Sequence, residues 1–347
     1  MNIPDEIPTT RYSGSKRRLL PWIWENIKDL PFDSALDVFG GTGSVSILLK
    51  YHGKRVHFND ILRANQWIGM ALVQNDSQTV STEELEYVLD VRNRRNFPGL
   101  IESEFKDIFF TDDENRWLDI VVTRIGCISQ VEKRALLMAA LFQSCLSKRP
   151  YNLFHRANLY MRTADVKRSF GNKKTWETPF PVLMRRFVAE YNKVVFSNNH
   201  RNEVVGGHDA FSVPNGVDLV YLDPPYFSSD KSSGTNYLDY YHFLEGLSNY
   251  GQWKDRIDTS RKTKGFGDIP AIDDFVRGDK IYQSFEKMIE RFKDNIVVLS
   301  YRSDGTPSER EIIEMFQENG KQVQVSRRHH RSALSKKSND ELLFVAN

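Results

Sequence analysis

The feature that most constrains the fold of this chain is a short apolar run that ends in a cluster of glycines. Residues 34–39 are mostly apolar and lead directly into two glycines, and residues 45–51 follow with the apolar spacing of a helix. Residues 55–60 then form a second short run that ends at Asp60. Strand, tight turn, helix and strand make one βαβ unit, and its right-handed crossover requires a parallel sheet. The pattern therefore predicts an α/β fold.

The same kind of pattern returns in the last third of the chain. Further strands are expected at 216–223, 295–301, 322–328 and 341–347, the last two as an antiparallel hairpin, and further helices at 18–27, 285–293 and 309–319. The middle of the chain, by contrast, looks helical and charged, with no strand alternation. We therefore expect an inserted domain at 64–201 and a second domain built from 1–63 and 202–347.

Composition sets only wide limits. The chain has 347 residues, of which 40% are hydrophobic and 27% charged, as in ordinary globular proteins. The first ten residues contain two acids and no apolar run, and no stretch approaches the roughly 18 apolar residues of a membrane span. We therefore expect a cytoplasmic protein with no signal peptide and no membrane segment. Cys127 and Cys145 lack the spacing of metal ligands, and we expect both to be reduced thiols in the core.

The glycine turn predicts a site for a nucleotide-like ligand. Glycines between a strand and a helix let the backbone approach a ligand closely and allow positive φ angles. Dinucleotide-binding proteins share this arrangement, but the pattern Gly41-x-Gly43-x-x-Ser46 lacks the third glycine, which disfavours a nicotinamide oxidoreductase. Asp60 ends the next strand, where such folds place an acid that accepts from ribose hydroxyls. The alternative for Asp60 is a solvated strand end.

A second motif, Asp223-Pro224-Pro225-Tyr226, directly follows an apolar strand. Two prolines make a stiff extended loop, and open α/β sheets bind ligands at the carboxyl ends of their strands. The amino group of adenine is a poor nucleophile because its lone pair is delocalised into the ring. Asp223 and the Pro224 carbonyl can accept its two hydrogens and weaken that delocalisation, and Tyr226 can stack on a base that has left the duplex. The alternative is an ordinary loop with a turn proline.

These motifs resemble those of the Dam-like N6-adenine DNA methyltransferases, in which the cofactor motif precedes the catalytic motif and a target-recognition domain lies between them. The segments that carry the resemblance are 11–16, 39–43, 207–211, 223–226, 237–247 and 341–347. The first of them departs from the family pattern at Tyr12, where Trp is common, and at Ser15, where Gly is common. The resemblance implies a Rossmann-like methyltransferase fold with a mostly parallel seven-stranded sheet, an antiparallel C-terminal hairpin and an inserted, mainly helical target-recognition domain.

The resemblance also implies roles for individual residues. The catalytic loop would consist of Asp223, Pro224, Pro225 and Tyr226. S-adenosylmethionine would contact Tyr12, Lys16, Asp37, Phe39, Gly40, Gly41, Gly43, Asp60, Asp209, Ala210 and Asp223. Within this set Lys16 is expected near the methionine carboxylate, Asp60 at the ribose, and residues 209–210 at the cofactor adenine. The reaction needs no metal ion and no covalent intermediate.

The second half of the insertion is basic. Residues 148–201 hold 12 Lys and Arg against three acids, a local charge of +9, although the whole chain carries only +2. A charge run by itself is usually a solvated surface, but in a DNA methyltransferase it favours phosphate contacts. We expect contacts to double-stranded DNA from Arg156, Arg162, Lys167, Arg168, Lys173 and Lys174. We also expect a monomer, and a modification role beside a restriction endonuclease that acts on the same site.

Two alternatives stay open from the residues alone. The motif at 223–226 also suits an enzyme that methylates N4 of cytosine or an adenine in RNA. The non-enzyme alternative is a DNA-binding regulator on a catalytically dead methyltransferase fold. The intact Asp223, Tyr226, Asp60 and glycine turn argue against that second alternative.

Overall fold

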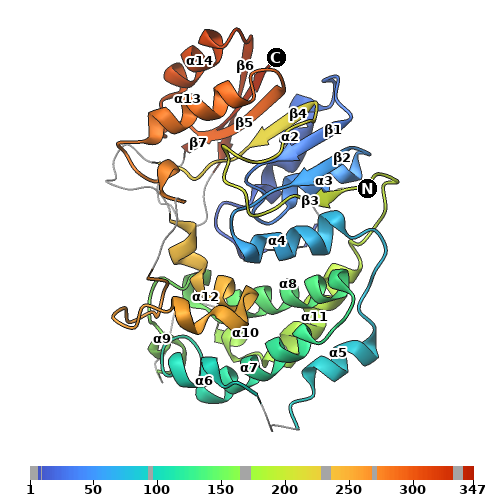
Figure 1. Ribbon diagram of the computed structural model, residues 1–347, viewed down its shortest axis with the longest axis vertical. Helices are drawn as coiled ribbons and strands as arrows, with labels where there is room; N and C mark the ends of the chain where they lie inside the picture. Colours follow the sequence, from blue (N-terminus) through green and yellow to red (C-terminus); the bar gives the residue numbers. More distant parts are fainter. Residues whose placement is uncertain are drawn as a thin grey trace.

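The computed structural model describes residues 7–92 except residue 9, together with 97–164, 173–227, 236–267, 272–330 and 339–347. A seven-stranded sheet lies in the upper part of the view in Figure 1, above a layer of helices, and its strand order is β3-β2-β1-β4-β5-β7-β6. The strands are β1 (Ser34–Asp37), β2 (Arg55–Phe58), β3 (Glu203–Val204), β4 (Leu219–Leu222), β5 (Ile296–Arg302), β6 (Val323–His330) and β7 (Asn339–Ala346).

The sheet is mostly parallel. β1 pairs in parallel with β2 and β4, and β5 continues the parallel order beyond β4. β7 runs antiparallel between β5 and β6, so the last two strands form the expected hairpin. The predicted Rossmann-like methyltransferase sheet is thereby confirmed. The structure adds β3 at the opposite edge, which was not predicted because a strand of two residues is too short to show a hydrophobic pattern.

Helices flank the sheet and form a further layer beside it. The helices next to the sheet are α2 (Leu20–Ile27), α3 (Ser44–Tyr51), α4 (Arg63–Gly69), α13 (Ile281–Arg291) and α14 (Glu309–Glu318). The helical layer contains α5 (Thr82–Leu89), α6 (Leu100–Glu104), α7 (Asp112–Gly126), α8 (Val131–Lys148), α9 (Tyr160–Thr163), α10 (Lys173–Glu177), α11 (Phe180–Asn192) and α12 (Tyr237–Ser248). Short single-turn helices are η1 (Lys16–Leu19), η2 (Met70–Gln74), η3 (Pro150–Asn152), η4 (Tyr250–Gln252), η5 (Lys254–Arg256) and η6 (Ile272–Phe275).

Successive side chains of a strand point to opposite faces of the sheet. Leu36 packs in the core on the face that α13 and α14 cover. Ala35 packs in the core on the other face, with α2 and α3. Two residues further along β1, Asp37 shares the face of Ala35 and lies beside its register partner Tyr221 on β4. Polar side chains therefore reach the α2 and α3 face just where β1 and β4 end.

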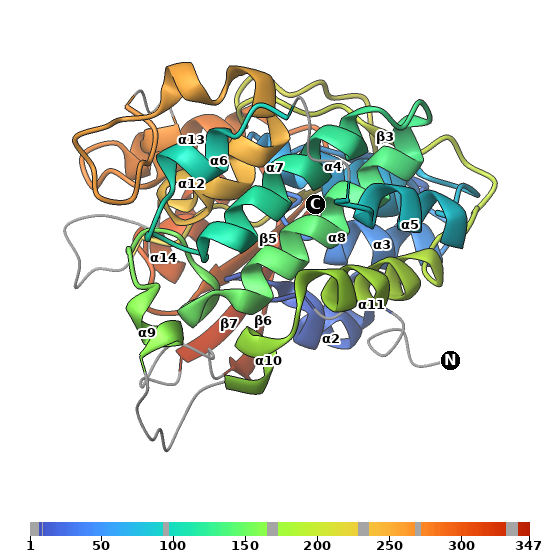
Figure 2. The same cartoon turned by 90° about the horizontal axis from the view of Figure 1, so that it is seen from below.

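One hydrophobic core joins the sheet to the helical layer. It runs from the α2 and α3 face through α4 and η2 into α8, where every residue from Ala135 to Lys148 is buried. Seen from below, α7, α8 and α11 lie side by side across this layer (Figure 2). Phe243 of α12 contacts Phe105 at a ring-centroid distance of 5.2 Å, so α12 also belongs to this core. The division of the chain into two domains, with 64–201 inserted, stays a prediction.

Two expectations from composition can be compared with the structure. None of the described helices combines the length and the apolar character that a membrane crossing requires. Cys145 is buried in α8, but Cys127 is exposed. The prediction of two core thiols is therefore wrong for Cys127, because that residue follows Gly126 at the end of α7, where the helix stops.

The contact between α12 and Trp253 offers a test of the helical packing. Gly246 lies so close to the Trp253 ring that an added Cβ would stand 1.9 Å from ring atom Cε2. Since the buried ring has no room to shift, we expect Gly246→Ala to lower the free energy of unfolding by about 1–3 kcal/mol. Chemical denaturation measures the change. Gly251→Ala is the matched control, because its Cβ would meet nothing within 4 Å; equal stability of the two variants would contradict the packing described.

Candidate active site

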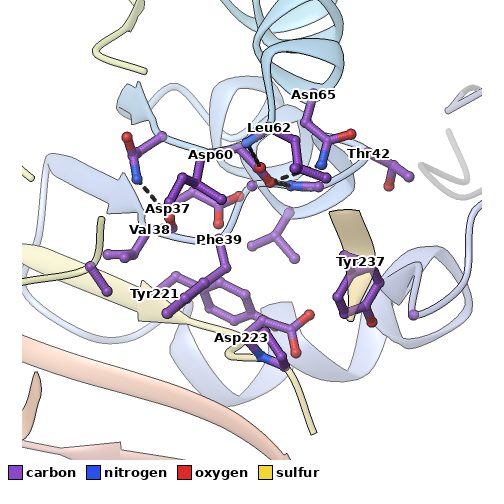
Figure 3. A pocket seen from close by; sticks show the side chains of 18 of the residues that line it. Asp37, Val38, Phe39, Thr42, Asp60, Leu62, Asn65, Tyr221, Asp223 and Tyr237 are labelled. Carbon is purple, nitrogen blue, oxygen red and sulfur yellow. Dashed lines mark hydrogen bonds between the residues drawn. The ribbon is translucent and has the colours of Figure 1, made fainter. Parts of the chain in front are cut away.

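A cavity of about 1110 Å³, measured with its open mouth, lies at the carboxyl ends of β1 and β4. Between these strands the chain order of the sheet reverses, which is where open α/β sheets bind ligands. Of the predicted site residues, Tyr12, Lys16, Asp37, Phe39, Gly40, Gly41, Asp60, Asp209, Ala210, Asp223, Pro225 and Tyr226 line the cavity, and Gly43 and Pro224 do not. Figure 3 shows Asp60 and Asn65 on one side, Asp223 and Tyr237 on the other, and Phe39 between them.

The glycine turn is shaped by close packing and by left-handed backbone. Gly41 and Gly43 have φ angles of 54° and 71°, a region that favours glycine. Gly40 packs against Phe58 so tightly that an added Cβ would lie 2.1 Å from the ring. The Gly43 amide donates to the Gly40 carbonyl, and α3 begins directly after Gly43. Gly43 therefore shapes the turn without lining the cavity.

Asp60 is 8% exposed, and its carboxylate ties the end of β2 to the glycine turn. Oδ2 accepts from the Gly41 amide at 2.9 Å and from Asn65 Nδ2 at 3.0 Å, and Oδ1 accepts from the Leu62 amide at 2.8 Å. Burial raises the pKa of Asp60, although these hydrogen bonds oppose the rise. A carboxylate offers about four acceptor positions. One of them, on Oδ1, is left for a ligand hydroxyl.

Asp37 carries a buried oxygen that has no hydrogen-bond partner among the described residues. The side chain lies in the cavity wall and is 1% exposed. Its Oδ2 accepts from Ser46 Oγ at 2.7 Å, whereas Oδ1 is unpartnered. Burial raises the pKa of Asp37 to about 7. Because an unpaired buried acceptor is costly, this position suits a ligand that brings a donor, above all a cationic one.

The carboxylate of Asp223 belongs to a buried cluster of polar groups. Oδ1 accepts from Lys16 Nζ at 2.7 Å and from the Tyr226 hydroxyl at 3.1 Å. Lys16 Nζ also contacts the Tyr226 hydroxyl and lies 3.3 Å from Oε1 of Glu341. The hydrogen bonds that Asp223 accepts from described side chains all reach Oδ1. One carboxylate oxygen is therefore held in place, and Oδ2 is left for a ligand.

Burial and neighbouring charges set the ionisation of this cluster. Burial raises the pKa of Asp223, Lys16 opposes the rise and Glu341 adds to it. Burial alone would lower the pKa of Lys16, but Asp223 and Glu341 together raise it above its usual value. Burial, followed by the charge of Asp223, raises the pKa of Tyr226 well above its usual value. At neutral pH Lys16 is therefore charged, and the Tyr226 hydroxyl is a donor.

Lys16 thus has a partner that was not predicted. We expected its ammonium near the methionine carboxylate of the cofactor, and that position stays a prediction; in the structure the ammonium pairs with Asp223. The two side chains are 6% and 17% exposed. Opposite charges with so little access to water pair because each offsets the desolvation of the other.

Aromatic rings line two sides of the cavity. Phe39 meets Phe275 edge-on at a centroid distance of 5.4 Å, and Phe275 stacks on Phe211 at 5.5 Å. On the other side Tyr12 stacks on Tyr241 at 4.2 Å. Flat apolar walls of this kind suit a planar heterocycle.

The predicted DNA-binding residues take different positions. Arg156 and Lys174 are exposed. The side chain of Arg162 is 7% exposed, and its guanidinium binds the two carboxylate oxygens of Glu114 at 2.8 and 3.0 Å. Glu114 also pairs with Lys148 at 2.9 Å, so part of the predicted basic charge is neutralised inside the helical layer. Lys167, Arg168 and the side chain of Lys173 lie outside the described part of the structure.

Several residues at the site were not predicted as site residues, among them Glu341, Ser300 and Phe275. Ser300 Oγ donates to Glu341 at 2.7 Å and so extends the polar cluster. A signal for Glu341 exists, because this acid directly precedes the apolar residues 342–346 of a buried strand. Phe275 follows a stretch with no regular hydrophobic period, and nothing in the local sequence directs its ring to the cavity.

Known proteins are similar to this chain along nearly its whole length. It is 27% identical over 359 residues to the type II methyltransferase M2.HphI of Haemophilus parahaemolyticus, with 99% of each chain covered. It is 22% identical over 356 residues to the type II methyltransferase M.CviAII of Paramecium bursaria Chlorella virus 1, with 96% of this chain and 97% of that one covered. The solved structure of the rRNA methyltransferase aviRa from Streptomyces viridochromogenes matches at 12% identity over 100% of this chain and 93% of that one, but a TM-score of 0.32 is too low to bear on fold or substrate.

A family model described as D12 class N6 adenine-specific DNA methyltransferase matches residues 12–252. The matched span is well over half of the chain and contains both the glycine turn and the 223–226 loop. This match favours adenine in DNA over the cytosine, RNA and non-enzyme alternatives. The chain belongs to the D12 class of N6 adenine-specific DNA methyltransferases, which take the methyl group from S-adenosylmethionine.

Proposed function

We propose that this chain methylates N6 of adenine at specific sites in double-stranded DNA, with S-adenosylmethionine in the cavity at β1 and β4 and the target adenine at the 223–226 loop. It acts as a monomer in the cytoplasm of a bacterium, encoded there or by a phage, as the modification half of a restriction-modification system whose endonuclease acts on the same site. The similarity to type II methyltransferases supports that context.

The observation that carries the proposal is the state of the Asp223 carboxylate. Its Oδ1 is held by Lys16 and Tyr226, while its Oδ2 receives no hydrogen bond from described side chains. The same residue lines the cavity that contains the glycine turn. An acceptor of this kind, fixed in direction and mostly shielded from water, is what the amino group of a target base needs.

The rest of the cavity fits S-adenosylmethionine. The bound cofactor supplies a methyl group that its sulfonium activates. The unpartnered Oδ1 of Asp37 would accept from the methionine ammonium. Asp60 has an acceptor position left for a ribose hydroxyl, and Phe39 and Phe275, beside residues 209–210, would hold the cofactor adenine.

Asp223 and Pro224 would prepare the target amino group. Oδ2 of Asp223 and the carbonyl of Pro224 accept its two hydrogens, which draws the nitrogen lone pair out of conjugation with the ring. The bound cofactor would supply the methyl group to this nitrogen, and Asp223 is placed to accept the hydrogen that then leaves the nitrogen as a proton. Holding two reactants in line in this way is worth roughly 7–11 kcal/mol.

Tyr226 and the helical layer would hold the DNA. The Tyr226 hydroxyl is fixed by Asp223 and Glu341, which orients the ring for stacking on a flipped base. The inserted segment 64–201 would act as the target-recognition domain, with phosphate contacts from the exposed Arg156 and Lys174. Arg162 is left out of this surface because its guanidinium binds Glu114.

The reaction and the role of Asp223 can be tested in one assay. The purified protein is incubated with methyl-tritiated S-adenosylmethionine and unmethylated duplex DNA, which is then digested to nucleosides. We expect the label in N6-methyladenine, and we expect Asp223→Asn to lower kcat by roughly 10²–10⁴ because the charged acceptor is lost. DNA affinity in a gel-shift assay should stay within about threefold of wild type, since Asp223 contributes little to phosphate contacts.

Two outcomes of that assay would contradict the proposal. Label in N4-methylcytosine, or transfer to RNA but not to duplex DNA, would overturn the assigned substrate. Turnover of Asp223→Asn within about tenfold of wild type would overturn the role of the carboxylate, since a general base contributes at least 10²-fold.

The pKa of Asp37 predicts a pH dependence of cofactor binding. A folded-state pKa of about 7 leaves most of the carboxyl protonated at pH 6, and only the carboxylate can accept the cofactor ammonium. The dissociation constant of S-adenosylmethionine should therefore fall about fivefold between pH 6 and pH 7, as the ionised fraction grows. Calorimetric titration measures it. Asp37→Asn should bind weakly and without this pH dependence, while Asp33→Asn, at a fully exposed position before β1, should behave as wild type.

A further inference from the structure

Glu341 is a buried acid at the carboxyl edge of the sheet. It lies near the start of β7, is 5% exposed and pairs in register with Arg302 of β5. Leu343, two residues along the same strand, packs in the core on the α2 and α3 face. By the alternation of strand side chains, Glu341 shares that face, which is also the face of Asp37 and Tyr221. The fold therefore brings the last strand to the catalytic loop.

One oxygen of Glu341 connects three groups of the site. Oε1 accepts from Ser300 Oγ at 2.7 Å and lies 3.3 Å from Lys16 Nζ. It also lies 2.9 Å from the Tyr226 hydroxyl, whose single proton can go either to Oε1 or to Oδ1 of Asp223. Two of these groups, Lys16 and Tyr226, are the ones that hold Oδ1 of Asp223. A buried carboxylate is costly unless it is paired and hydrogen-bonded. The ion pair with Lys16 and the hydrogen bond from Ser300 offset that cost next to the catalytic loop.

The position of Glu341 also decides how much of the Lys16 charge reaches Asp223. If Asp223 were the only partner of Lys16, the ammonium would neutralise the whole charge of the Asp223 carboxylate. That carboxylate has to accept a hydrogen bond from the amino group of the target adenine. With two carboxylates the single ammonium is shared, and the cluster of Lys16, Asp223 and Glu341 keeps one net negative charge. That charge can reside on the free oxygen of Asp223.

We propose that Glu341 is a positioning residue for methyl transfer: it holds the Lys16 ammonium beside Oδ1 of Asp223 and shares the charge of that ammonium, so that Oδ2 stays free and negatively charged. The inference rests on the proposed role of Asp223. It gives a catalytic task to a residue of the closing strand, 115 positions from Tyr226 in the sequence.

The titratable groups that face Asp223 determine the sign of the expected pH effect. They are Lys16 from η1, Asp37 from β1, Tyr221 from β4, Tyr226 from the loop, Tyr237 from α12 and Glu341 from β7. Among them Glu341 raises the pKa of Asp223, and Lys16 lowers it. Replacing Glu341 with a neutral side chain therefore lowers the pKa of Asp223 while the other facing groups stay in place.

The test compares Glu341→Gln with Asp340→Asn. Both changes remove one acid from neighbouring positions of β7, but Asp340 points to the other face and pairs with the exposed His329. For Glu341→Gln we expect kcat at saturating cofactor and duplex DNA to fall at least tenfold, with both KM values within about threefold, because a positioning group acts on the bound complex. The acid limb of the kcat profile should move to lower pH. Asp340→Asn should match wild type in rate and profile.

Two results would overturn the inference. Turnover of Glu341→Gln near that of wild type, with an unmoved acid limb, would show that Glu341 does not act on Asp223. A uniform loss at every pH, with no shift of the limb, would show that it has only a structural role. If thermal unfolding shows that Glu341→Gln does not fold, Glu341→Asp replaces it in the test, because aspartate keeps the negative charge. A lowered kcat with the acid limb of wild type supports the inference, and a kcat equal to that of wild type overturns it. Failure of the wild type to label adenine would instead overturn the proposed function.

Discussion

The buried ion pair between Lys16 and Asp223 is the interaction on which the rest of the site depends. It joins residues 207 positions apart and fixes the N-terminal segment over the carboxyl edge of the sheet. Leaving one partner of such a pair buried alone costs about 3–5 kcal/mol, so the pair holds both side chains in place. It also determines which oxygen of Asp223 is occupied and which is left for a substrate. Tyr226 and Glu341 complete the arrangement, because each of them contacts Lys16.

The sheet explains why these groups meet. β1 and β4 are neighbours in the sheet, although the segment between them in the chain contains most helices of the helical layer. The cavity lies where the carboxyl ends of these two strands meet. The antiparallel hairpin adds β7 beside β5, so that an acid near the beginning of the last strand reaches the same edge as the ends of the parallel strands. Strand alternation then directs Asp37, Tyr221 and Glu341 to one face. The residues assigned to the cofactor and the acceptor Asp223 therefore line one cavity.

Contiguous motifs could be predicted from the sequence, and contacts between distant segments could not. The glycine turn was predictable because positive φ angles and the close approach of Phe58 select glycine locally. The 223–226 loop was predictable because its prolines and its preceding strand adjoin in sequence. The partner of Lys16 depends on the register of several strands, and the role of Arg162 depends on Glu114, 48 residues away. A charge count along the chain cannot distinguish a buried, paired cation from one that faces DNA.

The most direct test of this account is the structure of the protein bound to S-adenosylhomocysteine and to duplex DNA that carries its mapped target site. We predict an adenine turned out of the duplex, with N6 about 3 Å from Oδ2 of Asp223 and from the Pro224 carbonyl. Lys16 should still contact Oδ1 of Asp223. A target base whose amino group lies away from Asp223, or a Lys16 that has left Asp223 for the cofactor carboxylate, would contradict the account.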